Sequence, residues 1–296
     1  MRHKLLALLL SATVLLSACL PMLALTVSAA GEPWEDSASW PALQALNTLQ
    51  KGQSYFSYHE WMGDTYNGVK QADVFGVNRE PSANARMIPY ATVESARQGA
   101  VDYAPELSSY YQLLTGEGQP WDLTVYKSPA LADAAGVSQN FYKTSYAGVQ
   151  ANPYTGKNEV SSYSDADYGC GWKSVTLPAS WQTQGFDFPI YSNTNIPWLG
   201  AYGNAGGGNA AMIPQAPLVT NPVGFYRRSF DVDADWLQNG KKVYISFQGV
   251  ESAMYLYVNG HEVGYSESSF DAHDYDITPF LNANGQGNVL AVRVHR

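Results

Sequence analysis

The chain has 296 residues, of which 45% are hydrophobic, so it can hold one large domain or two ordinary ones around a core. A formal net charge of −9 argues against nucleic acid or an anionic membrane surface as partner, because phosphate binding needs clustered Lys and Arg. The 21 Tyr and 8 Trp, with Gly, Pro, Asn and Ser between short apolar runs, favour an all-β protein or a carbohydrate binder over a helical bundle.

The first residues have the features of an export signal. Arg2 and Lys4 give a positive start, Leu5–Leu25 is almost wholly apolar, and Val27-Ser28-Ala29 offers a small-residue cleavage site. These features predict a signal peptide over residues 1–29 and a secreted, extracellular protein. No later apolar run is long enough to span a bilayer, so no membrane span is expected once the signal is removed.

A lipoprotein signal is the alternative for the same segment. Leu16-Ser17-Ala18-Cys19 has the right residues for lipid attachment at Cys19, which would anchor the protein at the cell surface. The run Leu20–Val27 stays apolar where a lipoprotein usually turns polar, and this disfavours the anchor. If Cys19 leaves with the signal, Cys170 remains alone, so no internal disulfide can form and stability must come from packing.

Residues 30–72 lack a clean period and are expected to form a leader or linker, with one short amphipathic helix over Trp40–Leu49. The stretch VFGVNREPSANARMIPY, residues 74–90, is extended and punctuated by proline. Val93–Gly99 is then expected to form one or two helical turns. We therefore expect an irregular N-terminal arm ahead of the main fold.

Strands are predicted from residue 110 onward. Tyr110–Leu114 and Trp121–Tyr126 are apolar and aromatic runs, and the turn-forming Thr115–Gly118 between them is a hairpin signal. Residues 131–170 are polar without a strong period and are expected to form a long loop that could hold one helix. Trp198–Leu218, with three consecutive glycines, is too flexible for a core element.

The second half of the chain has short apolar runs at regular spacing, which predicts an antiparallel sandwich or barrel. In MYLYVNGHEVGY the side chains alternate, and Asn259-Gly260 supplies the pair with positive φ that a type I′ turn requires. This hairpin is the sharpest local prediction. The predicted strands are Phe225–Val232, Val243–Phe247, Ala253–Val258, His261–Tyr265 and Val289–Val294.

Three groups of acidic residues and histidines imitate metal sites, and each has a better explanation. His261-Glu262 begins like a zinc-protease helix, but Tyr265 stands where the second His ligand is required. Asp231, Asp233 and Asp235 imitate a calcium loop without its central Gly, so a solvated strand end explains them better. A turn explains the densest cluster better than a metal site does, so no metal is assigned. That cluster consists of Asp271, His273, Asp274 and Asp276.

Other side chains allow two interpretations each. Arg227 and Arg228 lie in a predicted strand, and one of them could pair with an acid at the domain boundary. Trp181, Phe186 and Tyr191 could stack against a sugar ring, but anchoring of their loop in the core explains them better. The sequence holds no G-x-S-x-G elbow, P-loop or dinucleotide fingerprint.

Several motifs in order resemble one family. VTLPASWQTQGFDFPIYSN at residues 175–193, NPVGFYRRSFDV at 221–232 and the run at 244–278 resemble the opening domain of glycoside hydrolase family 2 β-galactosidases. Residues 74–90 resemble the family's amino-terminal arm. The resemblance spans residues 73–296 and implies an all-β fold, an antiparallel jelly-roll β-sandwich of the galactose-binding type that is incomplete at its C-terminus.

The resemblance also implies a function. The family hydrolyses terminal β-D-galactosides by a retaining mechanism, with two glutamates of a separate catalytic barrel as acid/base and nucleophile. Neither is expected before Arg296, so the chain is expected to hold no catalytic residue and to be inactive alone. Asn193 matches the asparagine that reaches the galactose in related enzymes, and its amide both donates and accepts. The residues alone favour a turn asparagine there, whereas the resemblance favours the sugar contact.

The expected partners are a galactoside carbohydrate, the missing catalytic domain of the same polypeptide and, as a further possibility, other copies of the chain. Related galactosidases use Mg²⁺ and Na⁺, with ligands mostly in the barrel, so no cofactor is expected on this chain. An incomplete sandwich also predicts an unpaired edge that is liable to aggregate. Two alternatives are a free-standing lectin-like module and a purely structural surface protein. The parent could also be a β-glucuronidase or β-mannosidase relative, because these share the sandwich.

Overall fold

The computed structural model describes residues 62–66, 69–72, 76–81, 87–102, 104–160, 167–189 and 222–296. The predicted signal peptide, the helix expected over residues 40–49 and the loop 198–218 lie outside these residues. The helical elements are α3 (Val93–Asp102), η2 (Pro105–Leu107), α4 (Pro129–Ala134), α5 (Gly148–Ala151), η4 (Trp181–Gln184), η7 (Ala234–Leu237) and η8 (Thr278–Phe280). Within the described ranges, no helix is long and apolar enough to cross a membrane.

Every pair of named strands in the described ranges is antiparallel. The strands are β1 (Met62–Tyr66), β2 (Val69–Ala72), β3 (Gly76–Val77), β4 (Pro120–Tyr126), β5 (Lys173–Thr176), β6 (Val223–Phe230), β7 (Tyr244–Phe247), β8 (Ala253–Val258), β9 (His261–Glu267), β10 (His273–Asp276) and β11 (Asn288–His295). All five strands predicted in the second half are present, with bounds shifted by up to two residues.

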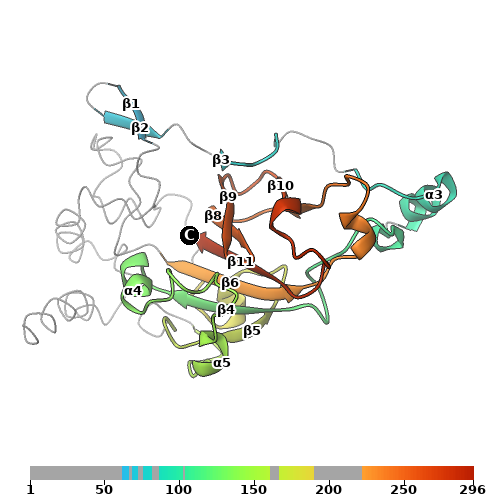
Figure 1. Ribbon diagram of the computed structural model, residues 1–296. Helices are drawn as coiled ribbons and strands as arrows, with labels where there is room; N and C mark the ends of the chain where they lie inside the picture. Colours follow the sequence, from blue (N-terminus) through green and yellow to red (C-terminus); the bar gives the residue numbers. More distant parts are fainter. Residues whose placement is uncertain are drawn as a thin grey trace, which may run out of the picture.

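A seven-stranded sheet forms the centre of the fold (Figure 1), in the order β3-β9-β8-β11-β6-β4-β5. The strand β11 lies in its middle and pairs along its whole length with β6 on one side, from Asn288 opposite Phe230 to His295 opposite Val223. On its other side β11 pairs with β8. Two smaller sheets pair β7 with β10 and β1 with β2. Because β11 has a partner on both sides, the unpaired edge expected of the sandwich does not lie at β11.

The two-stranded sheet β7/β10 covers one face of the central sheet. Because strand residues alternate between faces, Leu256, Leu290 and Val292 point to this side and form one buried cluster with Ile245 of β7 and Tyr275 of β10. Each fully buried side chain of this kind contributes about 1.5–3 kcal/mol to folding. Two antiparallel layers around one apolar core make a β-sandwich, and this confirms the all-β prediction.

The segment around residues 129–151 covers the other face. Phe141 is fully buried there, with its ring centroid 4.8 Å from that of Phe225 in β6 and 5.4 Å from that of Tyr257 in β8. Tyr142 stacks on Tyr257 with centroids 4.6 Å apart. The sequence predicts a long loop here that could hold one helix, whereas the structure has α4, α5 and aromatic side chains that close the second core.

The hairpin predicted at Asn259-Gly260 is confirmed. Asn259 has φ 51° and Gly260 φ 86°, and they connect β8 to β9. Beyond the turn the register shifts between Leu256 and Tyr257, so that Val263 has no direct partner in β8 and β9 bulges. In a regular strand Val263 and Tyr265 would point to the same face. The bulge turns them to different faces, so they lie in different buried clusters.

The helix predicted over Val93–Gly99 is confirmed as α3, at the far end of the molecule from β1 and β2 (Figure 1). Two reciprocal bonds cap its start. The hydroxyl of Thr92 accepts from the amide of Ser95 at 3.1 Å, and the hydroxyl of Ser95 accepts from the amide of Thr92 at 3.2 Å. These bonds satisfy amides that a helix N-terminus leaves open.

The hairpin predicted from Tyr110–Leu114 and Trp121–Tyr126 is wrong. The second run lies in β4, but β5 and β6 occupy both edges of β4 and leave no edge for another strand. Residues 110–114 form no strand. The carbonyl of Leu114 instead accepts a hydrogen bond from the indole nitrogen of Trp121 at 2.8 Å, so a side chain takes the place of a ladder bond.

The turn predicted for the cluster from Asp271 to Asp276 is also wrong in its second half, because His273–Asp276 is the strand β10. His273 and Tyr275 are buried and alternate with the half-buried Asp274 and Asp276, which is the period of a strand with one face in the core. The acidic residues that suggested a turn occupy the outward positions. The carboxylate of Asp276 then accepts from the amide of Thr278, the first residue of η8, at 3.0 Å.

Candidate functional site

Asn193, the predicted sugar contact, lies outside the described residues, as does Tyr191. The structure does describe the chain that leads toward Asn193, through η4 and on to Pro189, and the chain that resumes at Pro222. We call Trp181–Pro189 the stem.

The stem turns tightly because two residues adopt positive φ. Gly185 has φ 90° after η4, where any added Cβ would lie 2.8 Å from the carbonyl oxygen of Asn158, so only glycine fits. Asp187 has φ 57°, a conformation that Asp and Asn tolerate better than most residues. Between them Phe186 is fully buried, and Trp181 is buried in the same core cluster. The stem is therefore part of the sandwich core.

Asp187 is the centre of the stem's polar contacts. Its carboxylate is fully buried and accepts hydrogen bonds from the hydroxyl of Tyr168 at 2.5 Å and the indole nitrogen of Trp181 at 3.1 Å. The side-chain amide of Gln182 lies 3.4 Å away, and the guanidinium of Arg296 forms an ion pair with the same carboxylate. A buried carboxylate needs such donors, because its desolvation is otherwise costly.

Two carbonyl groups of the stem accept hydrogen bonds from side chains of β5 and of the segment before it. Lys173 donates to the carbonyl of Gln184 at 2.7 Å, and its ammonium lies 4.9 Å from the ring centroid of Tyr154. The Tyr154 hydroxyl is 2.7 Å from Asp167 and 3.0 Å from the carbonyl oxygen of Gly185. Burial raises the pKa of Tyr154, and the bond to Asp167 raises it further, so the phenol stays protonated.

Sequence reasoning missed Asp187 and Arg296. One signal for Asp187 is present in the sequence GFDFP, where an acidic residue stands between Phe186 and Phe188. If the two phenylalanines are buried, the carboxylate between them needs hydrogen-bond partners. Its partner Arg296 follows β11 and lies far away in sequence. No spacing rule connects the two, so only the folded arrangement could identify the pair.

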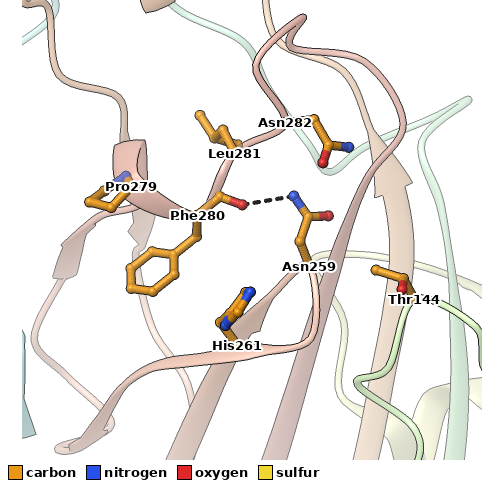
Figure 2. A pocket seen from close by; sticks show the side chains of 7 residues that line it. All are labelled: Thr144, Asn259, His261, Pro279, Phe280, Leu281 and Asn282. Atoms are coloured by element: carbon orange, nitrogen blue, oxygen red, sulfur yellow. Dashed lines mark hydrogen bonds between the residues drawn. The ribbon is translucent and has the colours of Figure 1, made fainter.

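A shallow, open depression lies beside the turn of the β8/β9 hairpin (Figure 2). Its volume is about 500 Å³, and its lining residues are Thr144, Asn259, His261, Pro279, Phe280, Leu281 and Asn282. Asn259 is engaged in the fold, since its amide donates to the carbonyl of Phe280 at 2.8 Å. The imidazole of His261 lies beside the ring of Phe280, with centroids 6.1 Å apart. The depression offers little enclosure for a ligand.

The residues that imitate metal sites serve the fold. Asp231 accepts from the amide of Gly287 at 2.7 Å, and Asp233 accepts from the amide of Asp235 at 2.9 Å at the start of η7. His261 and Glu262 begin β9. Across the described part of the chain, no three His, Cys, Asp or Glu residues are grouped so that they could hold a metal ion.

The two strand arginines point to opposite faces of β6. Arg227 is buried and donates to the carbonyl of Phe141 at 2.6 Å, opposite its cross-strand neighbour Asp122 in β4. Burial raises the pKa of Asp122, and the charge of Arg227 opposes that shift. Arg228 donates to the carbonyl of Leu114 and to the side chain of Gln119 at 2.7 Å. Both arginines therefore hold segments against the sheet. The core interpretation of Trp181 and Phe186 is confirmed.

Comparison with known proteins relates the chain to one family of enzymes. A family model described as "Glycosyl hydrolases family 2, sugar binding domain" matches residues 161–296. A β-galactosidase from Priestia megaterium is 35% identical over 240 residues, which are 81% of this chain and 18% of that protein. A β-galactosidase from Halalkalibacterium halodurans is 31% identical over 228 residues, which are 77% of this chain and 18% of that protein.

A solved structure of a β-glucuronidase from Ruminococcus gnavus in complex with D-glucaro 1,5-lactone is also similar. It has 17% sequence identity and a TM-score of 0.34, and the match covers 62% of this chain and 21% of that chain. This chain thus spans less than a quarter of each of the three relatives. The chain belongs to glycosyl hydrolase family 2, and its residues 161–296 match the model of that family's sugar binding domain.

Proposed function

We propose that this chain is the sugar-binding part of a secreted β-galactosidase that hydrolyses terminal β-D-galactosides by a retaining mechanism. The observation that carries the proposal is the similarity of 81% of the chain to a protein named β-galactosidase, with a second such relative over 77%. The architecture suits the role, because lectins and related sugar binders use double antiparallel sheets of this kind.

Within this proposal Asn193 contacts the galactose. An amide suits a sugar hydroxyl because it donates and accepts at once. Asn193 follows the stem closely in sequence. The stem is held by the core side chains Trp181 and Phe186 and by the hydrogen bonds and the ion pair of Asp187. A rigid support lowers the entropy lost on binding, so a contact beyond such a stem gains affinity.

The reacting carboxyls of this proposal lie on polypeptide outside residues 1–296. A retaining glycosidase needs an acid/base and a nucleophile about 5 Å apart, and the β-galactosidase relatives extend far beyond the part that this chain matches. The galactoside would then lie between this domain and a catalytic domain. Any Mg²⁺ or Na⁺ would be held mainly by that catalytic domain.

Export is the proposal's second part and rests on the apolar run of residues 5–25 with Arg2 and Lys4 before it. Sequencing the amino terminus of the exported protein tests it. A start at Ala30 supports a cleaved signal peptide, and a lipid-modified Cys19 supports a cell-surface anchor instead. An unprocessed protein retained inside the cell contradicts export.

The decisive experiment uses the polypeptide that carries this chain together with its catalytic part. We expect hydrolysis of o-nitrophenyl β-D-galactoside, and we expect Asn193→Ala to raise KM about tenfold, the loss of one well-placed hydrogen bond. Asn195→Ala is the matched control and should leave KM unchanged. Preference for a β-glucuronide, or an Asn193→Ala variant that behaves like the control, would contradict the proposal. So would efficient galactoside hydrolysis by purified residues 30–296.

A further inference from the structure

The depression beside the turn of the β8/β9 hairpin is open, but its walls are fixed to the fold. The fully buried side chain of Asn288 connects two of them, because its oxygen accepts from the amide of Asn282 and from the side chain of Asn259, both at 2.8 Å. The guanidinium of Arg227 holds the third wall, where it donates to the carbonyl of Thr144 at 3.4 Å. A ligand would therefore meet a preformed surface, and this lowers the entropy that is lost on binding.

One part of the depression is apolar and aromatic. Pro279 is exposed, and Phe280 and Leu281 are half-buried, so three consecutive apolar residues stay within reach of solvent. The exposed imidazole of His261 lies beside the Phe280 ring, with the centroids 6.1 Å apart and the planes tilted by 39° (Figure 2). Two rings at this angle form a shallow corner, against which a ring-shaped ligand can place one apolar face.

The other part of the depression offers hydrogen bonds. Thr144 is exposed, and its hydroxyl can donate and accept. Asn282 is also exposed; its side-chain nitrogen donates to the carbonyl of Gln286 at 2.9 Å, and its side-chain oxygen can accept from a ligand. In Figure 2 both residues lie across Asn259 from the two rings. A ligand in contact with both parts needs an apolar face and hydrogen-bonding groups at its edge.

The charge of the depression narrows the ligand further. None of the residues that line it is Lys, Arg, Asp or Glu. An anion would find neither a lysine nor an arginine there, and the net charge of −9 would repel it. A cation would find no carboxylate. An uncharged ligand is therefore favoured, and a pyranose combines an apolar face of C–H groups with hydroxyls around its edge.

We propose that this depression is a carbohydrate-binding site that takes one neutral pyranose unit. The apolar face of the sugar lies against His261 and Phe280. Its hydroxyls turn toward Thr144 and Asn282. Because the depression is open, the rest of a longer glycan can extend into solvent from the bound unit. The proposal goes beyond the proposed function, since this site uses neither Asn193 nor a catalytic carboxyl.

Saturation-transfer NMR titrations of the full chain with methyl β-D-galactopyranoside and methyl β-D-glucopyranoside test the site. We expect weak binding of at least one of them, with the strongest saturation on the ring C–H protons. His261→Ala should raise its Kd at least about threefold through loss of one ring, whereas His261→Tyr keeps a ring and should bind. Thr144→Val should raise the Kd about fivefold, and Thr144→Ser should restore it.

Phe270→Ala is the matched control, because its ring is 97% exposed and does not line the depression. It should bind like the wild type, and urea midpoints should show that all variants are folded. The uronate counterpart of the bound glycoside, with a carboxylate in place of the hydroxymethyl group, should bind at least about threefold more weakly, because no cation compensates its desolvation. Equal Kd values for the two ligands would overturn the assignment to a neutral sugar.

The same titrations in Asn193→Ala separate this site from the proposed function. Binding that persists in Asn193→Ala and weakens in His261→Ala and Thr144→Val supports the depression as a site. Binding that is lost in Asn193→Ala and unchanged in the other two variants overturns the site and leaves the proposed function intact. Absence of saturation transfer to either glycoside overturns the site as well.

Discussion

Asn259 is hydrogen-bonded to Val289 twice, through its backbone and through its side chain. Its amide donates to the Val289 carbonyl at 2.9 Å, and its side-chain oxygen accepts from the Val289 amide at 2.8 Å. Its side-chain nitrogen is 2.8 Å from both the carbonyl of Phe280 and the side-chain oxygen of Asn288 (Figure 2 shows the first bond). The turn residue of one hairpin thereby positions the start of the central strand β11 and the end of η8.

Replacement of Asn259 should separate these two roles. We expect Asn259→Gly to lower the free energy of unfolding by about 1–3 kcal/mol, because the side-chain bonds are lost while the positive φ is kept. Asn259→Ala should cost about 1 kcal/mol more, since φ 51° strains alanine. Urea unfolding monitored by tryptophan fluorescence measures both. Equal losses in the two variants would show that the turn conformation contributes nothing.

The sandwich could be predicted from the sequence because its strands carry their own pattern. In β8 the alternation of Met254, Leu256 and Val258 with tyrosines settles which residues face the small sheet, and Asn259-Gly260 sets the turn. These are local signals of period two and of one turn type. They need no knowledge of distant contacts, and so they predict all five strands of the second half correctly.

The errors arise where a distant partner decides the local structure. Residues 110–114 are apolar and aromatic like a strand, but β4 has no free edge for them. His273–Asp276 is polar like a turn, but pairing with β7 makes it a strand. For the same reason the sequence does not identify Asp187, because its ion-pair partner Arg296 follows β11 and is distant in the chain. Asn193 remains a prediction.

Arg227 holds the cover of the second sheet face, and its replacement should release that cover. We expect Arg227→Met to destabilise the chain by about 2–4 kcal/mol, because it leaves the carbonyl of Phe141 without its donor and Asp122 without a neighbouring positive charge. Adding Asp122→Asn should recover part of that loss. Hydrogen exchange should accelerate in residues 129–151.

Arg228→Met is the control for the Arg227 experiment. Arg228 lies on the opposite face of β6 and bonds to Leu114 and Gln119, so its loss should accelerate exchange near residues 114–119 instead. Equal exchange in residues 129–151 of the wild type and Arg227→Met would refute the assigned role of Arg227.

Gly224 in β6 leaves room for the indole of Trp181, and a larger residue should displace it. A Cβ at Gly224 would lie 2.6 Å from Cζ3 of Trp181, which is closer than real contacts allow. We expect Gly224→Ala to cost about 1–3 kcal/mol, the usual range for overpacking. In a Trp181→Phe background the added cost should shrink, because the smaller ring vacates that space. Additive losses in the double-mutant cycle would rule out direct conflict between the two positions.

His295 should make the stability of the sandwich depend on pH. It is buried in β11, with the Tyr255 ring centroid 5.8 Å away and Arg293 on the same face of the strand. Burial lowers the pKa of His295 well below 6.5, and the positive charge of Arg293 lowers it further. The folded chain therefore keeps this imidazole neutral at pH values where the unfolded chain would already bind a proton.

Because the unfolded state binds the extra proton, the stability that His295 contributes is fully present above pH 6.5 and is lost as the pH falls from 6.5 toward the lowered pKa. The slope of the free energy of unfolding in this window should approach about 1.4 kcal/mol per pH unit from this one group. Urea titrations at several pH values should show that slope in the wild type and in His261→Gln, whose imidazole is exposed at the hairpin. His295→Gln should lose it, whatever its absolute stability, since an amide cannot titrate. A slope that survives in His295→Gln would mean that another group carries the acid sensitivity.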